Sequence, residues 1–217
     1  MSFTTLYRWF DRRCRSYERK AVHLYTHRHD YSDWEFRFLT DALLSDIWQS
    51  WSLFSRIILL KSIRGTKARD GSFVIGLKRD NSWNRILYEI SNSLKGRAVT
   101  NTGHVNFKIR FELTWGDINV MLRAIQHMAP NNAATLLSAY GMPFNGIKHM
   151  QQVRNAAAHK NIETINDIQS LSIHYNTSVI KSPMDVIWAH KHTTTTLAIE
   201  QWLYEINLIA DLATSTK

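Results

Sequence analysis

The sequence predicts a mainly α-helical protein that carries a small α/β insertion. Apolar residues recur at three- and four-residue steps over most of the 217 positions, which is the period of amphipathic helices. Residues 66–113 break this period and contain β-prone runs. The chain has only eight Gly and three Pro, so it leaves little room for long linkers between domains. We therefore expect a single domain over residues 1–217, with an insertion at about residues 66–113.

The composition predicts a folded protein in a reducing compartment. Hydrophobic residues make up 44% of the chain and eight residues are Trp, which supports a sizeable core and argues against disorder. Cys14 is the single cysteine, so no intrachain disulfide can form. The first residues lack an apolar signal core, and apolar runs such as Ile57–Leu60 are too short to span a membrane. We therefore expect a cytoplasmic protein that neither spans nor binds a membrane.

The net charge of +9 predicts a polyanionic partner, with nucleic acid ahead of a membrane surface. A generally basic surface is the alternative. Residues 4–28 are expected to form an amphipathic helix, whose apolar side holds Leu6, Phe10, Cys14, Tyr17, Ala21 and Leu24. Four arginines lie within about 60° of each other on the opposite side: Arg8, Arg12, Arg15 and Arg19. Guanidinium groups match phosphate oxygens, so this arginine stripe is the predicted RNA-binding surface, with a solvated helix face as the alternative.

A second, longer helix is predicted over residues 32–63. Ser32 or Asp33 can cap its start, and Gly65 ends the segment. Its apolar stripe is rich in aromatic residues: Leu44, Trp48, Trp51, Phe54 and Ile58. We interpret this stripe as core and not as a ligand site.

The insertion is expected to contain one short helix and a small β element. Residues 83–94 have a helical period, whereas residues 73–77 are β-prone. Residues 105–113 alternate strictly between apolar and polar positions, which predicts a half-buried strand. We expect this strand to pair with residues 73–77.

Further helices are expected near residues 114–128, 132–141, 145–160 and 194–213, with a short one at 162–171. Thr114 and Asp117 form a predicted capping box for the first of these, and Asn132 is the predicted cap of the next. Residues 174–181 are expected to form a loop or a strand, and residues 182–192 to be irregular. The threonine run 193–196 is expected to begin the last helix.

The helix predicted over residues 145–160, NGIKHMQQVRNAAAHK, carries the candidate site. Asn145 can cap its start, and its apolar stripe contains Ile147, Met150, Val153 and Ala157. Around the neighbouring face the order is Arg154, Ala158, Gln151, Asn155 and His159. A cation, an amide and an imidazole therefore share one flank, and the small Ala158 between them allows another backbone to approach.

The segment from Arg154 to His159 resembles the R-x4-H signature of the HEPN superfamily. These are small helical domains, and many are metal-independent endoribonucleases that act as standalone toxins or defence effectors. The resemblance covers most of the chain in pattern, but only residues 154–159 in specific side chains. It implies a HEPN-like helical bundle and a homodimer in which two motif helices face each other across a composite cleft.

The resemblance also assigns roles to three side chains. Arg154 would bind the scissile phosphate, His159 would transfer protons, and Asn155 would orient the site. Some toxins of the superfamily continue the motif as His-x-Tyr, and a partner enzyme modifies the Tyr; here that position is Asn161. This difference argues against that mode of neutralisation, and the insertion at 66–113 also departs from a minimal HEPN domain.

The residues themselves make RNA cleavage chemically reasonable. RNA supplies its own 2′-OH as nucleophile, so no metal or other cofactor is expected. Histidine can carry out either proton step near neutral pH, and arginine stabilises charge on the phosphorane. One such His per chain provides half of the proton transfers, which favours a dimer. The pairs His27/His29 and His190/His192 lack further ligand spacing, so no metal site is predicted.

Three functions remain open from the sequence. The leading hypothesis is a HEPN endoribonuclease that acts as a toxin or antiviral defence effector. The second is a non-catalytic HEPN module that binds nucleotide, RNA or a partner protein such as an antitoxin or sensor. The third is an unrelated helical RNA-binding protein, for which we would expect His159 to lie in the core.

Overall fold

The computed structural model describes residues 1–77, 82–177, 179–192 and 194–215. These residues are mainly α-helical with one two-stranded sheet, which confirms the mainly α prediction. Two compact units make up the chain, and the helices α1, α2 and α9 contribute residues to both. Unit 1 comprises Met1–Trp9, Ser52–Met142 and Ile209–Lys217, and unit 2 comprises Phe10–Trp51 and Pro143–Leu208. The single-domain hypothesis stays a prediction.

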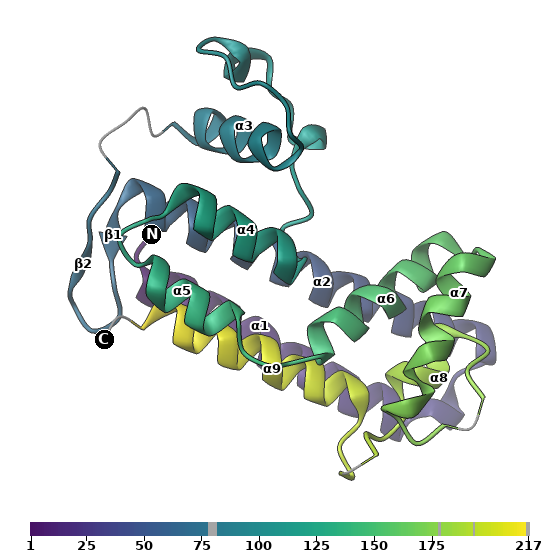
Figure 1. The fold of residues 1–217 in the computed structure, drawn as a ribbon. Helices are drawn as coiled ribbons and strands as arrows, with labels where there is room; N and C mark the ends of the chain where they lie inside the picture. The colour runs from purple at the N-terminus through teal and green to yellow at the C-terminus, as the bar shows by residue number, and fades with distance from the viewer. Residues whose placement is uncertain (78–81, 178, 193, 216–217) are drawn as a thin grey trace. The chain divides into compact units, whose positions relative to one another are not determined.

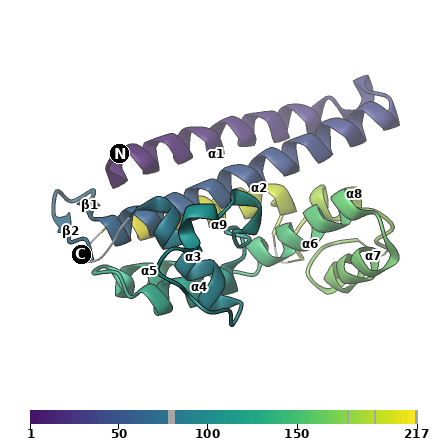
Figure 2. The ribbon, with the colours of Figure 1, turned by 90° about the horizontal axis from the view of Figure 1, so that it is seen from above.

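Unit 2 begins with a helical hairpin. It uses α1 (Phe3–Thr26) from Phe10 onward, the short 3₁₀ helix η1 (Arg28–Asp30), and α2 (Asp33–Arg64) as far as Trp51. Figure 2 shows α1 and α2 running back along each other from η1. Both helices match their predicted ranges to within two residues. Their apolar stripes are buried in this unit, with these members: Phe10, Cys14, Tyr17, Ala21, Leu24, Leu44, Trp48 and Trp51.

Local hydrogen bonds explain how the hairpin is fixed. The backbone N–H of Glu35 donates to Ser32 Oγ over 3.3 Å, and the N–H of Ser32 donates to Glu35 Oε2 over 2.9 Å. This reciprocal pair is a capping box. Of the two predicted caps, Ser32 and Asp33, the structure therefore uses Ser32. Across the hairpin, the hydroxyls of Tyr17 and Ser50 lie 2.7 Å apart in the core.

The rest of unit 2 packs around α6 (Gly146–His159). The helices α7 (Ile162–Gln169) and α8 (Pro183–Ile187) contact it and each other (Figure 1). The 3₁₀ helix η4 (Ser170–Ile173) continues α7, and α9 (Ala198–Thr214) belongs to this unit as far as Leu208. Isolated bridges join Tyr175 to Lys191 and His190 to Leu197. The predicted helix at 162–171 is confirmed.

Two predictions in unit 2 are wrong at their boundaries. Residues 182–192 are not wholly irregular, because α8 begins with Ser182 and Asp185 as a capping box and Pro183 in the first turn. The last helix begins at Ala198 and not at 194. The preceding residues are used in a turn, since Lys191 N–H donates to Thr196 C=O over 3.1 Å, and Leu197 pairs with His190. Thr193 lies outside the described residues.

Unit 1 combines the ends of three helices with the insertion. Its own elements are β1 (Thr66–Lys67), β2 (Phe73–Val74), α3 (Trp83–Leu94), the 3₁₀ helices η2 (Gly103–Asn106) and η3 (Ile109–Phe111), α4 (Ile118–Met128) and α5 (Ala133–Tyr140). Its core is formed by residues from most of these helices: Leu6, Phe54, Ile58, Ile86, Leu87, Ile90, Met121, Ile125, Leu136, Tyr140 and Ile209. The predicted helix at 83–94 is confirmed.

The predicted strand at 105–113 is wrong. This segment forms η2 and η3, and its apolar residues Val105 and Ile109 are 68% and 77% exposed. From the β-prone stretch at 73–77, Phe73 and Val74 pair instead with β1, in an antiparallel hairpin. Side-chain hydrogen bonds, and not backbone strand pairing, fix this segment. The Glu112 carboxylate accepts from Arg56 Nε over 2.7 Å and from Trp115 Nε1 over 2.8 Å.

Helix α4 starts four residues later than predicted. Asp117 is itself the N-cap, because its carboxylate accepts from the N–H groups of Asn119 and Val120 over 2.8 and 3.2 Å. Thr114 therefore lies outside the helix. Asn132 does occupy the N-cap position of α5, but its side chain makes no capping hydrogen bond there.

Candidate functional site

Helix α6 is capped by a side chain from α9 and not by Asn145. Asn145 occupies the N-cap position without a side-chain capping bond, so the predicted cap is wrong in this detail. Instead, the N–H of Gly146 donates to Glu205 Oε2 over 2.8 Å. A carboxylate at this end also complements the positive end of the helix dipole.

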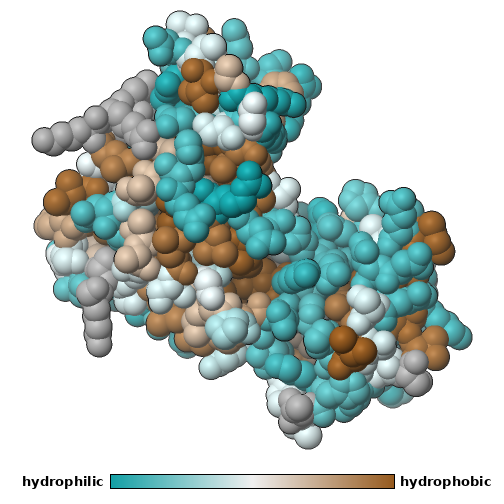
Figure 3. Space-filling model, viewed as in Figure 1, coloured by the Kyte–Doolittle hydropathy of each residue, from teal (hydrophilic) through white to brown (hydrophobic). Residues whose placement is uncertain are grey.

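The buried face of α6 follows the predicted stripe with one change. Ile147, Met150 and Val153 are at most 1% exposed. Ala156 completes the stripe, since Ala157 is partly exposed. The outer face of the helix is therefore left for the polar motif. Figure 3 shows that the surface over α6 and α7 is mostly hydrophilic.

The structure brings two of the three motif residues together. Arg154 and Asn155 are half-buried, and Arg154 Nη1 donates to Asn155 Oδ1 over 3.4 Å. His159 is exposed on the last turn of α6, so the core position expected of an unrelated protein is not observed. His159 lies five positions after Arg154 on the helix, which places the two about 140° apart around the axis and about 7.5 Å apart along it.

The end of α6 follows directly after His159. Lys160 adopts a left-handed conformation with φ of 50°, and its N–H donates to Ala156 C=O over 3.2 Å. Asn161 then caps α7, because its Oδ1 accepts from the N–H of Thr164 over 2.9 Å. Asn161 therefore has a structural role as the N-cap of α7.

The predicted arginine stripe lies on the surface of α1. Arg8, Arg12, Arg15 and Arg19 are all exposed; Arg8 belongs to unit 1 and the other three to unit 2. Arg15 is paired with Asp11, with 3.1 Å between Nη2 and Oδ2. The other cations of the stripe are therefore better placed than Arg15 to meet phosphates.

A buried polar network that was not predicted from the sequence lies beside the first half of α6. Trp202 Nε1 donates to the Tyr175 hydroxyl over 2.9 Å, and this hydroxyl lies 2.9 Å from His149 Nδ1. Gln201 Nε2 donates to Glu205 Oε1 over 3.0 Å. His149, Tyr175 and Glu205 are at most 7% exposed. A Glu in the apolar stripe of α9 and a Gly inside α6 were the available signals.

Burial changes the protonation of this network. It lowers the pKa of His149 to about 4, with smaller contributions from His174, Lys148 and Lys191. Burial also raises the pKa of the Glu205 carboxyl and of the Tyr175 hydroxyl. His149 is therefore neutral at pH 7. Because the Trp202 N–H donates to the Tyr175 oxygen, the Tyr175 proton can be donated to His149 Nδ1, which leaves the His149 proton on Nε2.

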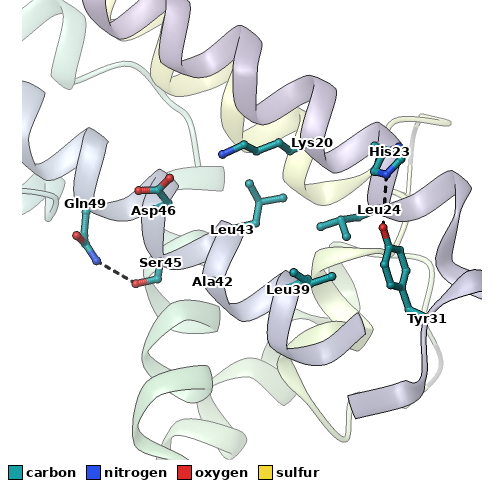
Figure 4. Close-up of a pocket in the computed structure, with 10 residues that line it drawn as sticks. All are labelled: Lys20, His23, Leu24, Tyr31, Leu39, Ala42, Leu43, Ser45, Asp46 and Gln49. Carbon is teal, nitrogen blue, oxygen red and sulfur yellow. Dashed lines mark hydrogen bonds between the residues drawn. The ribbon is translucent and has the colours of Figure 1, made fainter. Parts of the chain in front are cut away.

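A groove in unit 2, of about 640 Å³, lies between α1 and α2. Figure 4 shows Leu24 of α1 facing Leu39 and Leu43 of α2, with Lys20 and Asp46 among the polar residues around them. None of the motif residues lines it. This groove is mainly apolar, and its polar lining includes His23 as well as Lys20 and Asp46.

Three of the four histidines in the pairs His27/His29 and His190/His192 lie against backbone carbonyls, and His29 Nε2 accepts from Arg28 Nε over 3.3 Å. His190 Nδ1 lies 2.8 Å from Thr195 C=O, and His192 Nε2 lies 3.1 Å from Ser172 C=O. His27 Nδ1 similarly lies 3.0 Å from His23 C=O. Across the described residues, no group of three or more His, Cys, Asp or Glu side chains is arranged to hold a metal ion.

Comparison with known proteins gives no further assignment. No protein-family model, curated protein or solved structure matches the chain. Among the described helices, none is both long enough and apolar enough to cross a membrane.

Proposed function

We propose that this protein is a metal-independent endoribonuclease of the HEPN type, acting in the cytoplasm as a toxin or antiviral defence effector. The observation that carries the proposal is the outer face of α6, where the Arg154–Asn155 pair and an exposed His159 lie on one helix. The net charge of +9 and the exposed arginine stripe on α1 support RNA as the substrate.

Each motif residue has a distinct chemical role in this proposal. Arg154 binds the scissile phosphate and stabilises the charge that develops on its oxygens. His159 transfers a proton, either from the attacking 2′-OH or to the leaving 5′-oxygen. Asn155 orients Arg154 through the 3.4 Å contact. The 2′-OH attack displaces the 5′-oxygen and leaves a 2′,3′-cyclic phosphate.

Helix geometry supports a site shared between two copies. Side chains about 140° apart on one helix diverge, so Arg154 and His159 of the same chain do not converge readily on one phosphate. A second α6 related by two-fold symmetry supplies the missing Arg and His. The small Ala158 between them is exposed and leaves space for that approach.

A non-catalytic module that binds nucleotide, RNA or a partner protein, such as an antitoxin or sensor, is the second candidate. The observation that favours it is a cavity of about 310 Å³ beside the first half of α6, which lies in the size range of small-ligand pockets. This candidate predicts RNA or nucleotide binding that survives loss of His159 and produces no cleavage.

The proposal is tested by incubating purified protein with total RNA in excess EDTA and analysing the fragment ends. We expect 2′,3′-cyclic phosphates and 5′-OH ends. His159→Ala and Arg154→Ala should each lower the cleavage rate by about 10²- to 10⁴-fold. Lys148→Ala, an exposed change on the same helix, should cleave at the wild-type rate. Activity abolished by the chelator, or fragments with 5′-phosphates, would show that the proposed chemistry is wrong.

A further inference from the structure

The cavity of about 310 Å³ in unit 2 has a buried polar floor and a partly exposed mouth. Glu205, Tyr175 and His149 are buried in its lining, while Lys191, His174 and Gln201 are partly exposed. The rings of His149 and His174 pack at a tilt of 34°, with their centroids 4.6 Å apart. The cavity therefore offers aromatic surface together with hydrogen-bonding groups of both kinds.

The floor is fixed before any ligand arrives. Glu205 is held by Gly146 N–H at 2.8 Å and by Gln201 Nε2 at 3.0 Å, so each carboxylate oxygen already accepts one bond and retains a further lone pair. The chain from Trp202 through Tyr175 fixes the His149 ring in the same way. Preorganised polar groups of this kind give specificity, because a ligand that fails to match them leaves them unpaired.

The charges in the cavity disfavour simple ions, because one group of each sign lines it. A free anion such as phosphate would meet the Glu205 carboxylate, and a free amine would meet the Lys191 ammonium. A neutral planar group that carries donors and acceptors side by side suits both. Nucleobases have this property, and aromatic side chains are the usual surface on which unpaired bases stack.

We propose that this cavity binds an unpaired RNA base next to the cleavage site, and that guanine fits it best. Guanine presents adjacent N–H donors to Glu205, and its O6 and N7 are acceptors that lysine commonly contacts. This inference rests on the proposed ribonuclease function, and it specifies which RNA base that enzyme would prefer. His149 and Arg154 are five residues apart on α6, about 7.5 Å along its axis and about 140° around it, so RNA that reaches both must follow the surface of the helix from the cavity to the motif.

The direct test measures binding of the four ribonucleosides by saturation-transfer NMR, using the full chain and no cleavage step. We expect guanosine to bind best, and binding to fall at least about tenfold in Lys191→Met and in Gln201→Leu, which loses a support of Glu205. Gln49→Leu, in the groove between α1 and α2, is the matched control and should bind as the wild type does. Circular dichroism confirms that each variant is folded.

The outcomes separate this inference from the proposed function. Equal, weak binding of all four nucleosides, or inorganic phosphate competing as well as guanosine, would overturn the base pocket even if RNA is cleaved. Guanosine binding that depends on Lys191, without any RNA cleavage, would support the pocket and defeat the ribonuclease proposal. If both hold, Lys191→Met should flatten the base preference at cleavage positions while fragment ends remain the same.

Discussion

The carboxylate of Glu205 accepts a 2.8 Å hydrogen bond from the backbone N–H of Gly146, which joins α9 to the first residue of the motif helix. The two groups can approach closely because residue 146 has no side chain. A Cβ built there would collide with Glu205 Oε2 and lie 2.8 Å from Trp202 Cδ1. The position of α6 against α9 therefore depends on this glycine.

Replacing Gly146 with Ala should lower the free energy of unfolding by about 1–3 kcal/mol, because an added methyl group in a packed site forces its neighbours to move. The higher helix propensity of Ala acts in the opposite direction and offsets less than about 1 kcal/mol of this loss. Urea denaturation measures the change, with Lys148→Ala as the exposed control on the same helix. Unchanged stability in Gly146→Ala would contradict the close packing of α6 against α9.

The pH dependence of stability should report on His149. Its pKa is about 4 in the folded protein and ordinarily 6.5, so below pH 6.5 the unfolded chain takes up a proton that the folded protein does not. Stability should therefore fall as the pH falls from 6.5 towards 4, by up to about 3 kcal/mol from this group.

Glu205 opposes part of that loss, because burial raises its pKa and favours proton uptake by the folded state as the pH falls towards 4.5. His149→Gln should remove the histidine contribution and flatten the slope of unfolding free energy against pH. Denaturant titrations at several pH values provide the measurement. Parallel curves for wild type and His149→Gln would show that this imidazole does not control the slope.

The long helices could be predicted because their own residues determine which face is buried. The stripe from Phe10 to Leu24 on α1 is buried as its period requires. The alternation at 105–113 wrongly predicted a strand, because a strand also needs a partner. The expected partner lies in the 73–77 segment, where Phe73 and Val74 pair with β1 instead. Exposed Val105 and Ile109 show that alternation alone does not create a buried face.

The candidate site could be predicted only in part for a related reason. Arg154, Asn155 and His159 lie on one helix, so a helical projection was enough to group them. The network of Glu205, Tyr175 and His149 joins three distant parts of the chain, and no local period reveals such contacts. The start of α6 depends on Glu205 for the same reason, so Asn145 was a reasonable but wrong cap.

The arginine stripe should contribute affinity for RNA and leave the cleavage chemistry unchanged. Removing one cation that binds a phosphate of single-stranded RNA reduces the slope of log K against log salt by about 0.7, because fewer counterions are released. Changing all four arginines to Gln should lower the slope by about 2, since Arg15 is already paired with Asp11.

Filter-binding titrations with His159→Ala measure this slope without cleavage. A matched variant carries Gln at four other exposed cations, Lys67, Arg97, Lys108 and Arg110. If both quadruple variants change the slope equally, the effect belongs to total charge and not to the stripe.

Cys14 should react with thiol reagents only when the protein opens. Its side chain is fully buried, and burial raises the pKa of the thiol, so the reactive thiolate is suppressed. Labelling of the native protein should be slower than in denaturant by on the order of 10³-fold or more. Thr26→Cys, at the exposed end of α1, is the control that should label rapidly. Equal rates at both positions would contradict the packing of α1.

A site shared between two copies predicts that inactive variants can complement each other. Arg154→Ala retains His159, and His159→Ala retains Arg154, so a mixed dimer has one intact residue of each kind on opposite chains. Each variant alone should lose about 10²- to 10⁴-fold in RNA cleavage. Co-refolding equal amounts should restore activity at least about tenfold above either variant, because roughly half of the dimers are then mixed.

The control for this complementation is the double variant Arg154→Ala/His159→Ala, co-refolded with Arg154→Ala. That mixture contains no intact Arg154, so any recovery of cleavage in it is non-specific. Light scattering should show a dimer at micromolar concentration in the preparation that cleaves RNA. A monomer that cleaves RNA, or a mixture no more active than its parts, would place Arg154 and His159 in a site within one chain, which their divergence on α6 argues against.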